Sequence, residues 1–313
     1  MSKKDISIIT SLYRSEQFFP AYRKQFIQIQ SKLADVGIDV ELILVANDPT
    51  ENELNEIDNL KMFVDARVLQ VPRESLYKSW NRGIAAAESL VIGFWNVDDV
   101  RYSDYMIEAY ENLQRGFDLV DAKFLGTNTI QQDSVRSEIH PAYSQDLVSP
   151  KLCVSPFFMF TKKFIEQAGM FDEKFKIAGD FEWCTRSVVR KAKYVELRQM
   201  SGEFTVHGSN LSNSTNPLEW VEINIVLLYR DMYHELRPVK PDLMQQKWQE
   251  HNDRGCTIPE NIRAWLWGKG ATQRYEQYTK EREAHPLLRR MRLALAKRGL
   301  FPSVEWNAHN KPK

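Results

Sequence analysis

The stretch Phe94-Trp95-Asn96-Val97-Asp98-Asp99 ends an apolar run abruptly in two adjacent carboxylates. Residues 90–95 have the length and composition of a strand buried on both faces, which is typical of a parallel sheet. Open α/β sheets bind their ligands at the carboxyl ends of the strands, which is where these carboxylates fall. Adjacent carboxylates are costly unless a cation or hydrogen-bond donors compensate them, so the stretch predicts either a cation site or, alternatively, a solvated Asp-Asp turn.

Strand-like and helix-like segments alternate through the first 120 or so residues. Apolar or β-branched runs predict strands, and periodic segments with capping residues predict helices between them. This alternation favours βαβ units and a mainly parallel central sheet flanked by helices. Residues 126–150 are polar and irregular, which predicts a functional loop such as a substrate lid, and residues 180–189 predict a further helix. The predicted strands are 6–12, 40–45, 68–71 and 90–95, and the helices are 16–35, 51–60 and 75–89.

Charge, hydropathy and cysteine count exclude several classes of protein. The chain has 313 residues, with 42 Lys and Arg against 42 Asp and Glu, so no net charge favours nucleic acid as a partner. No run of about 18 apolar residues predicts a transmembrane helix, and no apolar leader follows Met1. Three widely spaced cysteines, Cys153, Cys184 and Cys256, fit neither a disulfide framework nor a zinc site and favour a reducing cytoplasm.

The C-terminal third differs in character from the rest. From residue 218 onward the pattern is almost wholly helical and rich in tryptophan, which predicts a catalytic-type domain over 1–215 and a helical extension over 216–313. Residues 287–300 place apolar side chains among arginines and lysines. Such a helix either lies on an anionic membrane surface or packs on the domain or on a second copy of the chain. We therefore expect a cytoplasmic protein that is free, oligomeric, or peripheral at the inner face of a membrane.

Six segments in order resemble the inverting family 2 glycosyltransferases of the GT-A fold. The resemblance runs from Ile6 to about Asn213, and each motif alone is weak, whereas their joint order is informative. The segments are Ile6-Ser7-Ile8-Ile9-Thr10-Ser11-Leu12-Tyr13-Arg14, residues 42–48 ending in Asp48, Ser79-Trp80-Asn81-Arg82-Gly83-Ile84, residues 95–99, Ala178-Gly179-Asp180-Phe181-Glu182-Trp183 with Arg186, and His207-Gly208-Ser209-Asn210-Leu211-Ser212.

The resemblance assigns a nucleotide-sugar donor, UDP-linked, to the first four segments. Asp48 is expected to accept the imide N–H of uracil, with an Asx-turn before Pro49 as its structural alternative. Tyr13 is expected to stack on the base, and Thr10 to contact it through the backbone. The donor-binding residues that the resemblance implies are Thr10, Tyr13, Asp48, Asn81, Asn96 and Asp98.

The same resemblance implies a divalent cation, Mn²⁺ or Mg²⁺, that holds the diphosphate. Asp99 is the first candidate ligand, and Asp98 is assigned to the ribose with metal contact through water. His207 could complete the shell, since an imidazole suits manganese better than magnesium. The alternative for His207 is an ordinary loop histidine.

Asp180 is the expected catalytic base, because an acceptor hydroxyl is a poor nucleophile until a positioned group takes its proton. Its structural alternative is a helix N-cap. Glu182 is the second candidate, as a base or as a residue that orients Asp180. Arg186 lies four residues beyond Glu182, a spacing that also predicts an ion pair on one helix face.

The resemblance implies a metal-dependent glycosyltransferase that moves a sugar to a saccharide or lipid-linked acceptor hydroxyl. Transfer would occur by single displacement with inversion, in surface polysaccharide or glycan synthesis. Asn96, Trp80 and Gly179 depart from the usual family residues, and Asn96 and Gly179 leave a noncatalytic carbohydrate- or partner-binding protein as an alternative. A sugar nucleotidyltransferase is the other alternative, but that class needs a glycine-rich phosphate loop, and residues 5–20 contain no glycine.

Overall fold

The structure is a computed structural model whose described residues are 4–128, 135–143, 153–207, 210–211, 222 and 226. The chain divides into two compact units, one formed by Met1–Ala142 with Cys153–Asn213 and the other by Tyr143–Leu152 with Ser214–Lys313. Every helix and strand named below belongs to the first unit. Apart from Glu222 and Val226, the predicted helical region from residue 218 and the basic segment 287–300 lie outside the described residues.

A seven-stranded sheet with the order β10-β6-β9-β4-β1-β2-β3 forms the core of the first unit. All neighbouring strands are parallel except β9, which is antiparallel to both β4 and β6. The apolar runs seen in the sequence are buried on both faces, so the predicted α/β class with a mainly parallel sheet is confirmed. The strands are β1 (Ile6–Leu12), β2 (Val40–Asn47), β3 (Ala66–Val71), β4 (Val91–Phe94), β6 (Leu119–Ala122), β9 (Met159–Thr161) and β10 (Tyr194–Leu197).

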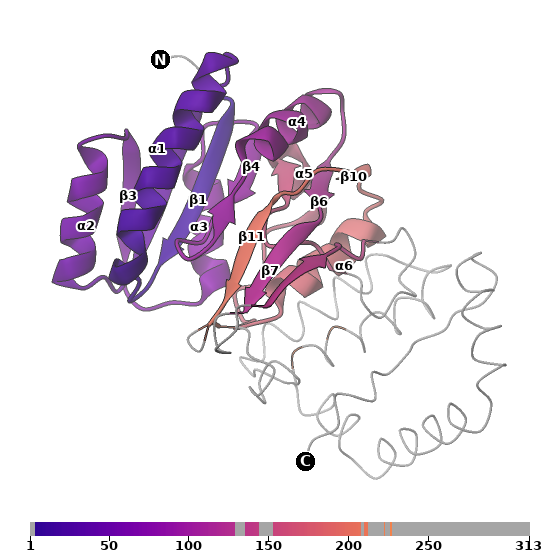
Figure 1. Cartoon of the computed structure of the whole chain (residues 1–313). Coiled ribbons are helices and arrows are strands. Elements are labelled where there is room, and N and C mark those ends of the chain that lie inside the picture. The colour runs from indigo at the N-terminus through magenta and orange to yellow at the C-terminus, as the bar shows by residue number, and fades with distance from the viewer. Residues whose placement is uncertain are drawn as a thin grey trace, which may run out of the picture. The chain divides into compact units, whose positions relative to one another are not determined.

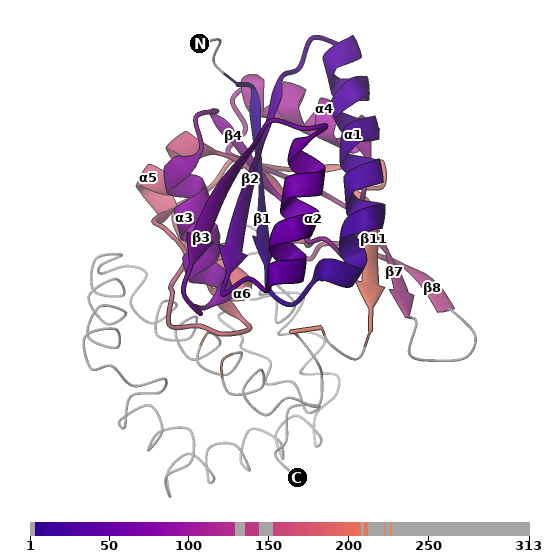
Figure 2. The same ribbon diagram turned by 90° about the vertical axis from the view of Figure 1, so that its left-hand side faces the viewer.

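Helices cover both faces of this sheet. Helices α1 (Phe19–Asp35), α2 (Glu51–Lys61) and α4 (Ser103–Gln114) lie on one face, and α3 (Leu76–Ala86) and α5 (Lys162–Ala168) lie on the other (Figures 1 and 2). The short helix η1 (Glu16–Phe18) leads into α1, and α6 (Gly179–Val189) packs beside α5. Side chains of Thr50, Ser75 and Thr161 cap α2, α3 and α5, which fixes where these helices begin. None of the described helices combines the length and apolar character needed to span a bilayer.

A second, four-stranded sheet has the order β5-β11-β7-β8. It contains β5 (Val100–Arg101), β7 (Phe124–Asn128), β8 (Val135–Ile139) and β11 (Gly202–Val206), and β7 and β8 pair antiparallel. The sequence predicted an irregular stretch over residues 126–150. This prediction is wrong for residues 126–128 and 135–139, which lie in β7 and β8, whereas residues 140–143 belong to no helix or strand. Two features prevented these strands from being recognised in the sequence. A glycine, Gly126, occupies a buried position of β7 where a large apolar residue would reveal the period of two, and β8 is an exposed edge strand with Arg136 and Glu138.

Close packing and hydrogen bonds hold the carboxyl ends of β1 and β4 in place. A Cβ atom at Gly83 would lie 2.3 Å from Cγ2 of Ile9, so only glycine lets α3 lie this close to β1. On the opposite face, the hydroxyl of Thr10 donates to the carbonyl oxygen of Trp95 at 2.7 Å. The hydroxyls of Thr10 and Tyr22 are also 2.7 Å apart. The carboxyl ends of β1 and β4 are therefore fixed relative to one another.

Candidate active site

Polar side chains gather where β1, β2 and β3 end at the same edge of the sheet. Arg14 follows β1, Asp48 follows β2, and the guanidinium of Arg14 lies 3.3 Å from the carboxylate of Asp48. Arg73, just beyond β3, stacks on the ring of Tyr13 with its Cζ 3.4 Å from the ring centroid. Tyr13 is 42% exposed, which makes it a surface platform and not a core residue. The three loops thus present an acceptor beside two cationic donors and an aromatic face.

The backbone of this cluster is strained. Arg14 has a φ of 53° and Asp48 a φ of 52°, and neither is a glycine. Left-handed backbone costs an ordinary residue roughly 1–2 kcal/mol, and such residues concentrate at functional sites. The carboxylate of Asp48 is half exposed and pairs with Arg14, and no described contact shows the Asx-turn that was the structural alternative.

Thr10 is placed differently from Tyr13. Its side chain is fully buried, and its hydroxyl is used by Tyr22 and Trp95 inside the core. A contact between Thr10 and a nucleotide could therefore involve only its backbone, which is the kind of contact that the sequence predicted.

Asp98, in the loop after β4, meets His207, which directly follows β11. They lie 109 positions apart in the sequence, yet Nε2 of His207 is 2.8 Å from Oδ2 of Asp98. The ring of Phe18 stacks against His207 with a centroid distance of 5.3 Å. Both side chains of the pair remain 18% exposed, so a ligand can reach them.

Asp99 is buried and hydrogen-bonded within the chain, which favours Asp98 over Asp99 as a metal ligand. It is 3% exposed, and its carboxyl oxygens accept from Thr205 N–H and from the side-chain amide of Asn96, each at 3.0 Å. Burial, and then the charge of Asp98, raises the pKa of Asp99 well above its ordinary value. Within the described residues no three His, Cys, Asp or Glu side chains are arranged to hold a metal ion. Asp98 and His207 therefore remain as candidate ligands, and Asp99 and Asn96 support the loop that carries them.

Asn81 also has a structural role in place of the predicted contact with the donor. Its amide nitrogen donates to the carbonyl oxygen of Phe171 at 2.8 Å and to Oε1 of Glu173 at 3.1 Å. Its amide oxygen accepts from Phe171 N–H at 3.0 Å. Both amide hydrogens are thus used to hold the loop before α6, and none is left for a nucleotide. The neighbouring Trp80 is a core residue that stacks on Phe94.

Asp180 lies in the first turn of α6 and is partly exposed. The N-cap of α6 is Ala178, so the N-cap alternative for Asp180 is wrong. Oδ1 of Asp180 accepts from Phe181 N–H at 2.8 Å and from the hydroxyl of Tyr77 at 3.2 Å. A Cβ atom at Gly179 would lie 2.6 Å from the Tyr77 ring, so the glycine that departs from the family residue makes room for this ring.

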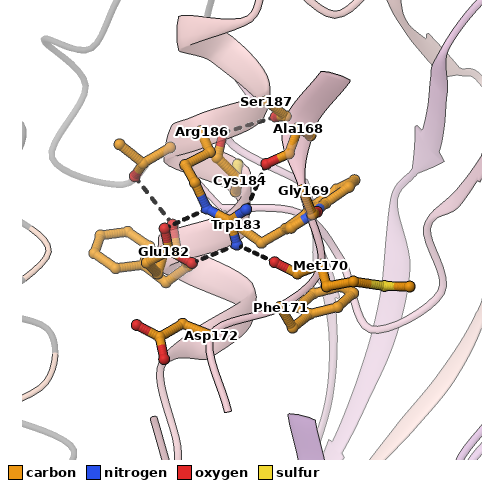
Figure 3. A network of polar contacts seen from close by, with 12 residues as sticks. Ala168, Gly169, Met170, Phe171, Asp172, Glu182, Trp183, Cys184, Arg186 and Ser187 are labelled. Carbon is orange, nitrogen blue, oxygen red and sulfur yellow. Dashed lines mark hydrogen bonds and ion pairs between the residues drawn. The ribbon is translucent and has the colours of Figure 1, made fainter. Parts of the chain in front are cut away.

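Glu182 is not retained as a candidate base. It is 1% exposed, and both its oxygens accept from the guanidinium of Arg186, with Nη2 to Oε2 at 2.8 Å (Figure 3). Burial raises the pKa of Glu182 and the charge of Arg186 opposes the shift. Arg186 also donates to the carbonyl oxygens of Ala168 and Met170. The ion pair that the spacing of four residues predicted is therefore confirmed, and Arg186 also ties α6 to the end of α5.

Four side chains that the sequence did not single out stand next to the candidates. They are Phe18 beside His207, Tyr77 beside Asp180, and Arg14 and Arg73 beside Tyr13. Nothing local in the sequence marks Phe18 or Tyr77, because each contact joins residues more than one hundred positions apart. The arginines are visible only as charges near predicted strand ends.

No family model matches the sequence, and a search of curated proteins finds no match. Solved structures do resemble the chain. S. aureus TarS 1–349 in complex with UDP-GlcNAc gives a TM-score of 0.56 at 16% identity, covering 83% of this chain and 83% of that chain. The complex of S. aureus TarS 1–349 with UDP gives a TM-score of 0.53 at 16% identity, covering 72% of this chain and 65% of that chain.

A further structure, of S. aureus TarS, gives a TM-score of 0.53 at 14% identity and covers 72% of this chain. The match spans only 39% of that TarS chain. Identities this low show a shared fold alone, an α/β fold with a mainly parallel central sheet.

Proposed function

We propose that the chain transfers a sugar from a UDP-sugar to an acceptor hydroxyl. One observation carries this proposal: the fold brings the acidic and imidazole side chains of Asp98 and His207 to 2.8 Å at the sheet edge where Tyr13, Arg14 and Asp48 also lie. A uridine diphosphate needs a site for its base and a site for its charge on one surface. The complexes of TarS 1–349 with UDP and UDP-GlcNAc support this class of donor.

Asp48 would accept the imide N–H of uracil, and the guanidinium groups of Arg14 and Arg73 would donate to the carbonyl oxygens beside it. Together these side chains offer an acceptor and two sets of donors, which the edge of uracil can use because it presents one donor between two acceptors. Cytosine has a different pattern and would leave Asp48 facing an acceptor. Arg73 already stacks on the Tyr13 ring, and the side chain of Tyr13 remains 42% exposed, so it can still contact the base.

Asp98 and His207 fit a divalent cation, because one carboxylate and one imidazole leave room for diphosphate oxygens and water in the shell. When bound, Mn²⁺ or Mg²⁺ would neutralise negative charge on the leaving diphosphate. Phe18 would hold the imidazole of His207 in place by stacking.

Asp180 would accept the proton of the acceptor hydroxyl, and its carboxyl is held at Oδ1 by Phe181 N–H and the Tyr77 hydroxyl. A single displacement by that hydroxyl inverts the anomeric configuration. We include in the proposal the inverting family 2 mechanism, a saccharide or lipid-linked acceptor, and a place in glycan or surface polysaccharide synthesis, all supported by the sequence resemblance.

A panel of UDP-sugars tests the proposal. UDP-GlcNAc, UDP-glucose and UDP-galactose are each incubated with the protein and Mn²⁺, and release of UDP is followed with and without a chelator. We expect metal-dependent release from at least one donor, and its loss in Asp180→Asn. Asp58→Asn removes a carboxylate from the exposed face of α2 and should leave the rate unchanged. Equal release from chelated and metal-loaded protein, or no release from any donor, would contradict the proposal.

A further inference from the structure

Glu53 is a fully buried carboxylate that joins two loops of the candidate site. It belongs to the first turn of α2 and is 0% exposed. Its Oε1 accepts from the backbone N–H of Ser15 at 2.7 Å and from the Ser15 hydroxyl at 2.9 Å. Its Oε2 accepts from the backbone N–H of Thr50 at 3.3 Å. The two partners are 35 positions apart and follow different strands of the sheet.

The positions of these partners matter because each lies beside a candidate base-binding residue. Ser15 directly follows Tyr13 and Arg14 after β1, and Thr50 comes two residues after Asp48 beyond β2. Arg14 and Asp48 are the two residues in left-handed backbone, and their side chains are 3.3 Å apart. Both strained turns therefore end at a hydrogen bond to the same carboxylate.

Helix capping explains only half of this arrangement. The Thr50 hydroxyl accepts from Glu53 N–H at 3.0 Å, and Oε2 of Glu53 returns to Thr50 N–H, which completes a capping box for α2. That motif needs one carboxylate oxygen, and the other commonly faces water. Here Oε1 turns inward to Ser15, so the side chain is wholly desolvated, a cost that its three neutral donors must offset. The cap alone does not require that cost.

We propose that Glu53 is a positioning residue for nucleotide recognition, which holds the loop after β1 against the loop after β2 before the base arrives. This inference rests on the proposed function, since it assigns the base of a uridine nucleotide to these loops. A preformed arrangement of Tyr13, Arg14 and Asp48 spares the ligand the entropy cost of ordering two loops. Glu53 itself, being fully buried, touches no part of the ligand.

Three variants separate the bridge from the helix cap. Glu53→Gln breaks the bridge, because an amide has an oxygen on one side only and can satisfy Ser15 or Thr50 but not both. Ser15→Ala removes the hydroxyl bond to Oε1 and leaves the capping box intact, so it carries the test if Glu53→Gln fails to fold. Thr50→Ala is the matched control, since it removes the cap on Glu53 N–H while the Thr50 N–H still donates to Glu53.

The measurement is calorimetric titration of each full-length variant with UDP in the presence of Mn²⁺, and with pyrophosphate, which has no base. We expect the Kd for UDP to rise roughly 10-fold in Glu53→Gln and a few-fold in Ser15→Ala. The Kd for pyrophosphate should change less than about two-fold. Thr50→Ala should lower Tm by about 2–4 °C and leave the Kd for UDP within about two-fold.

The outcomes distinguish this inference from the proposed function. A parent protein that binds no UDP would overturn both. A parent that binds UDP, with Glu53→Gln and Ser15→Ala binding it equally well, would overturn only the role of Glu53. Equal losses of UDP affinity in Glu53→Gln and Thr50→Ala, or equal losses for UDP and pyrophosphate, would show that Glu53 acts only through the stability of α2.

Discussion

Replacing Asp180 by asparagine keeps the size of the side chain but removes its ability to take a proton. The amide oxygen can still accept from Phe181 N–H, which is 2.8 Å from Oδ1 in the parent protein. The lost charge in the first turn of α6 should cost about 0.3–1 kcal/mol of stability. A positioned base contributes roughly 100-fold or more to the rate, so transfer should fall by that factor, about 2.7 kcal/mol in activation free energy.

Tyr77→Phe adds a sharper test, because it keeps the ring that packs on Gly179 and removes only the hydroxyl. That hydroxyl lies 3.2 Å from Oδ1 of Asp180 and is shared with the carbonyl oxygen of Ile177, so we expect its bond to be worth about 1 kcal/mol, or roughly 5-fold in rate. If Tyr77 acts through Asp180, the same change should cost less than about two-fold in the Asp180→Asn background.

Initial rates of UDP release with Mn²⁺, from the UDP-sugar that the panel identifies as donor, are measured for the parent, both single variants and the double variant. These four rates give the double-mutant cycle between Tyr77 and Asp180. Donor KM should be unchanged throughout, since Asp180 is assigned to the acceptor side. Thermal unfolding of each variant shows whether it is folded. An Asp180→Asn protein that turns over at the parental rate but melts much earlier would refute the assignment and make Asp180 a structural residue.

Three further predictions concern the surroundings of the site. Asp48→Ala should weaken UDP binding by about 1.5–3 kcal/mol through loss of a charge-assisted hydrogen bond, and unchanged affinity by calorimetry would make Asp48 only a turn former. Glu182→Ala should lower the free energy of unfolding by about 3–5 kcal/mol, because Arg186 loses its buried partner. The transfer rate per folded molecule should stay within a few-fold of the parent. A large loss of rate without a loss of stability would restore Glu182 as a candidate base. Burial raises the pKa of Asp121 to about 7, so its carboxyl binds a proton more tightly in the folded than in the unfolded chain. The free energy of unfolding should therefore fall by on the order of 4 kcal/mol as pH rises from about 4 to 7. Urea unfolding at pH 5 and pH 7.5 should show this fall in the parent protein and not in Asp121→Asn.

Much of the central sheet could be predicted from the sequence because parallel strands covered on both faces leave continuous apolar runs. The strand 6–12 agrees with β1 at both ends, and Thr50 and Ser75 mark the starts of α2 and α3. The second sheet could not be predicted in this way. Its strand β7 buries Gly126 instead of a large apolar residue, and β8 exposes its charged side chains, so neither has a readable hydrophobic period.

The candidate site shows the same division between local and long-range information. The Asp98-Asp99 pair is obvious in the sequence, but only the fold shows that Asp98 faces His207 while Asp99 turns inward to Thr205. The Thr-x-x-Glu spacing from Thr50 to Glu53 is a readable capping box. Its second function cannot be read from the sequence, because the contact with Ser15 joins segments 38 positions apart.

The central claim is that Asp98 and His207 hold a cation that helps to bind the diphosphate of a UDP-sugar. Calorimetric titration of the protein with UDP, first with Mn²⁺ and then with a chelator, tests this most directly, and Asp98→Asn serves as the site variant. The account predicts that UDP binds with Mn²⁺, and that binding weakens at least 10-fold both on chelation and in Asp98→Asn. Equal affinity for UDP with and without the metal, in the parent and in Asp98→Asn, would contradict it.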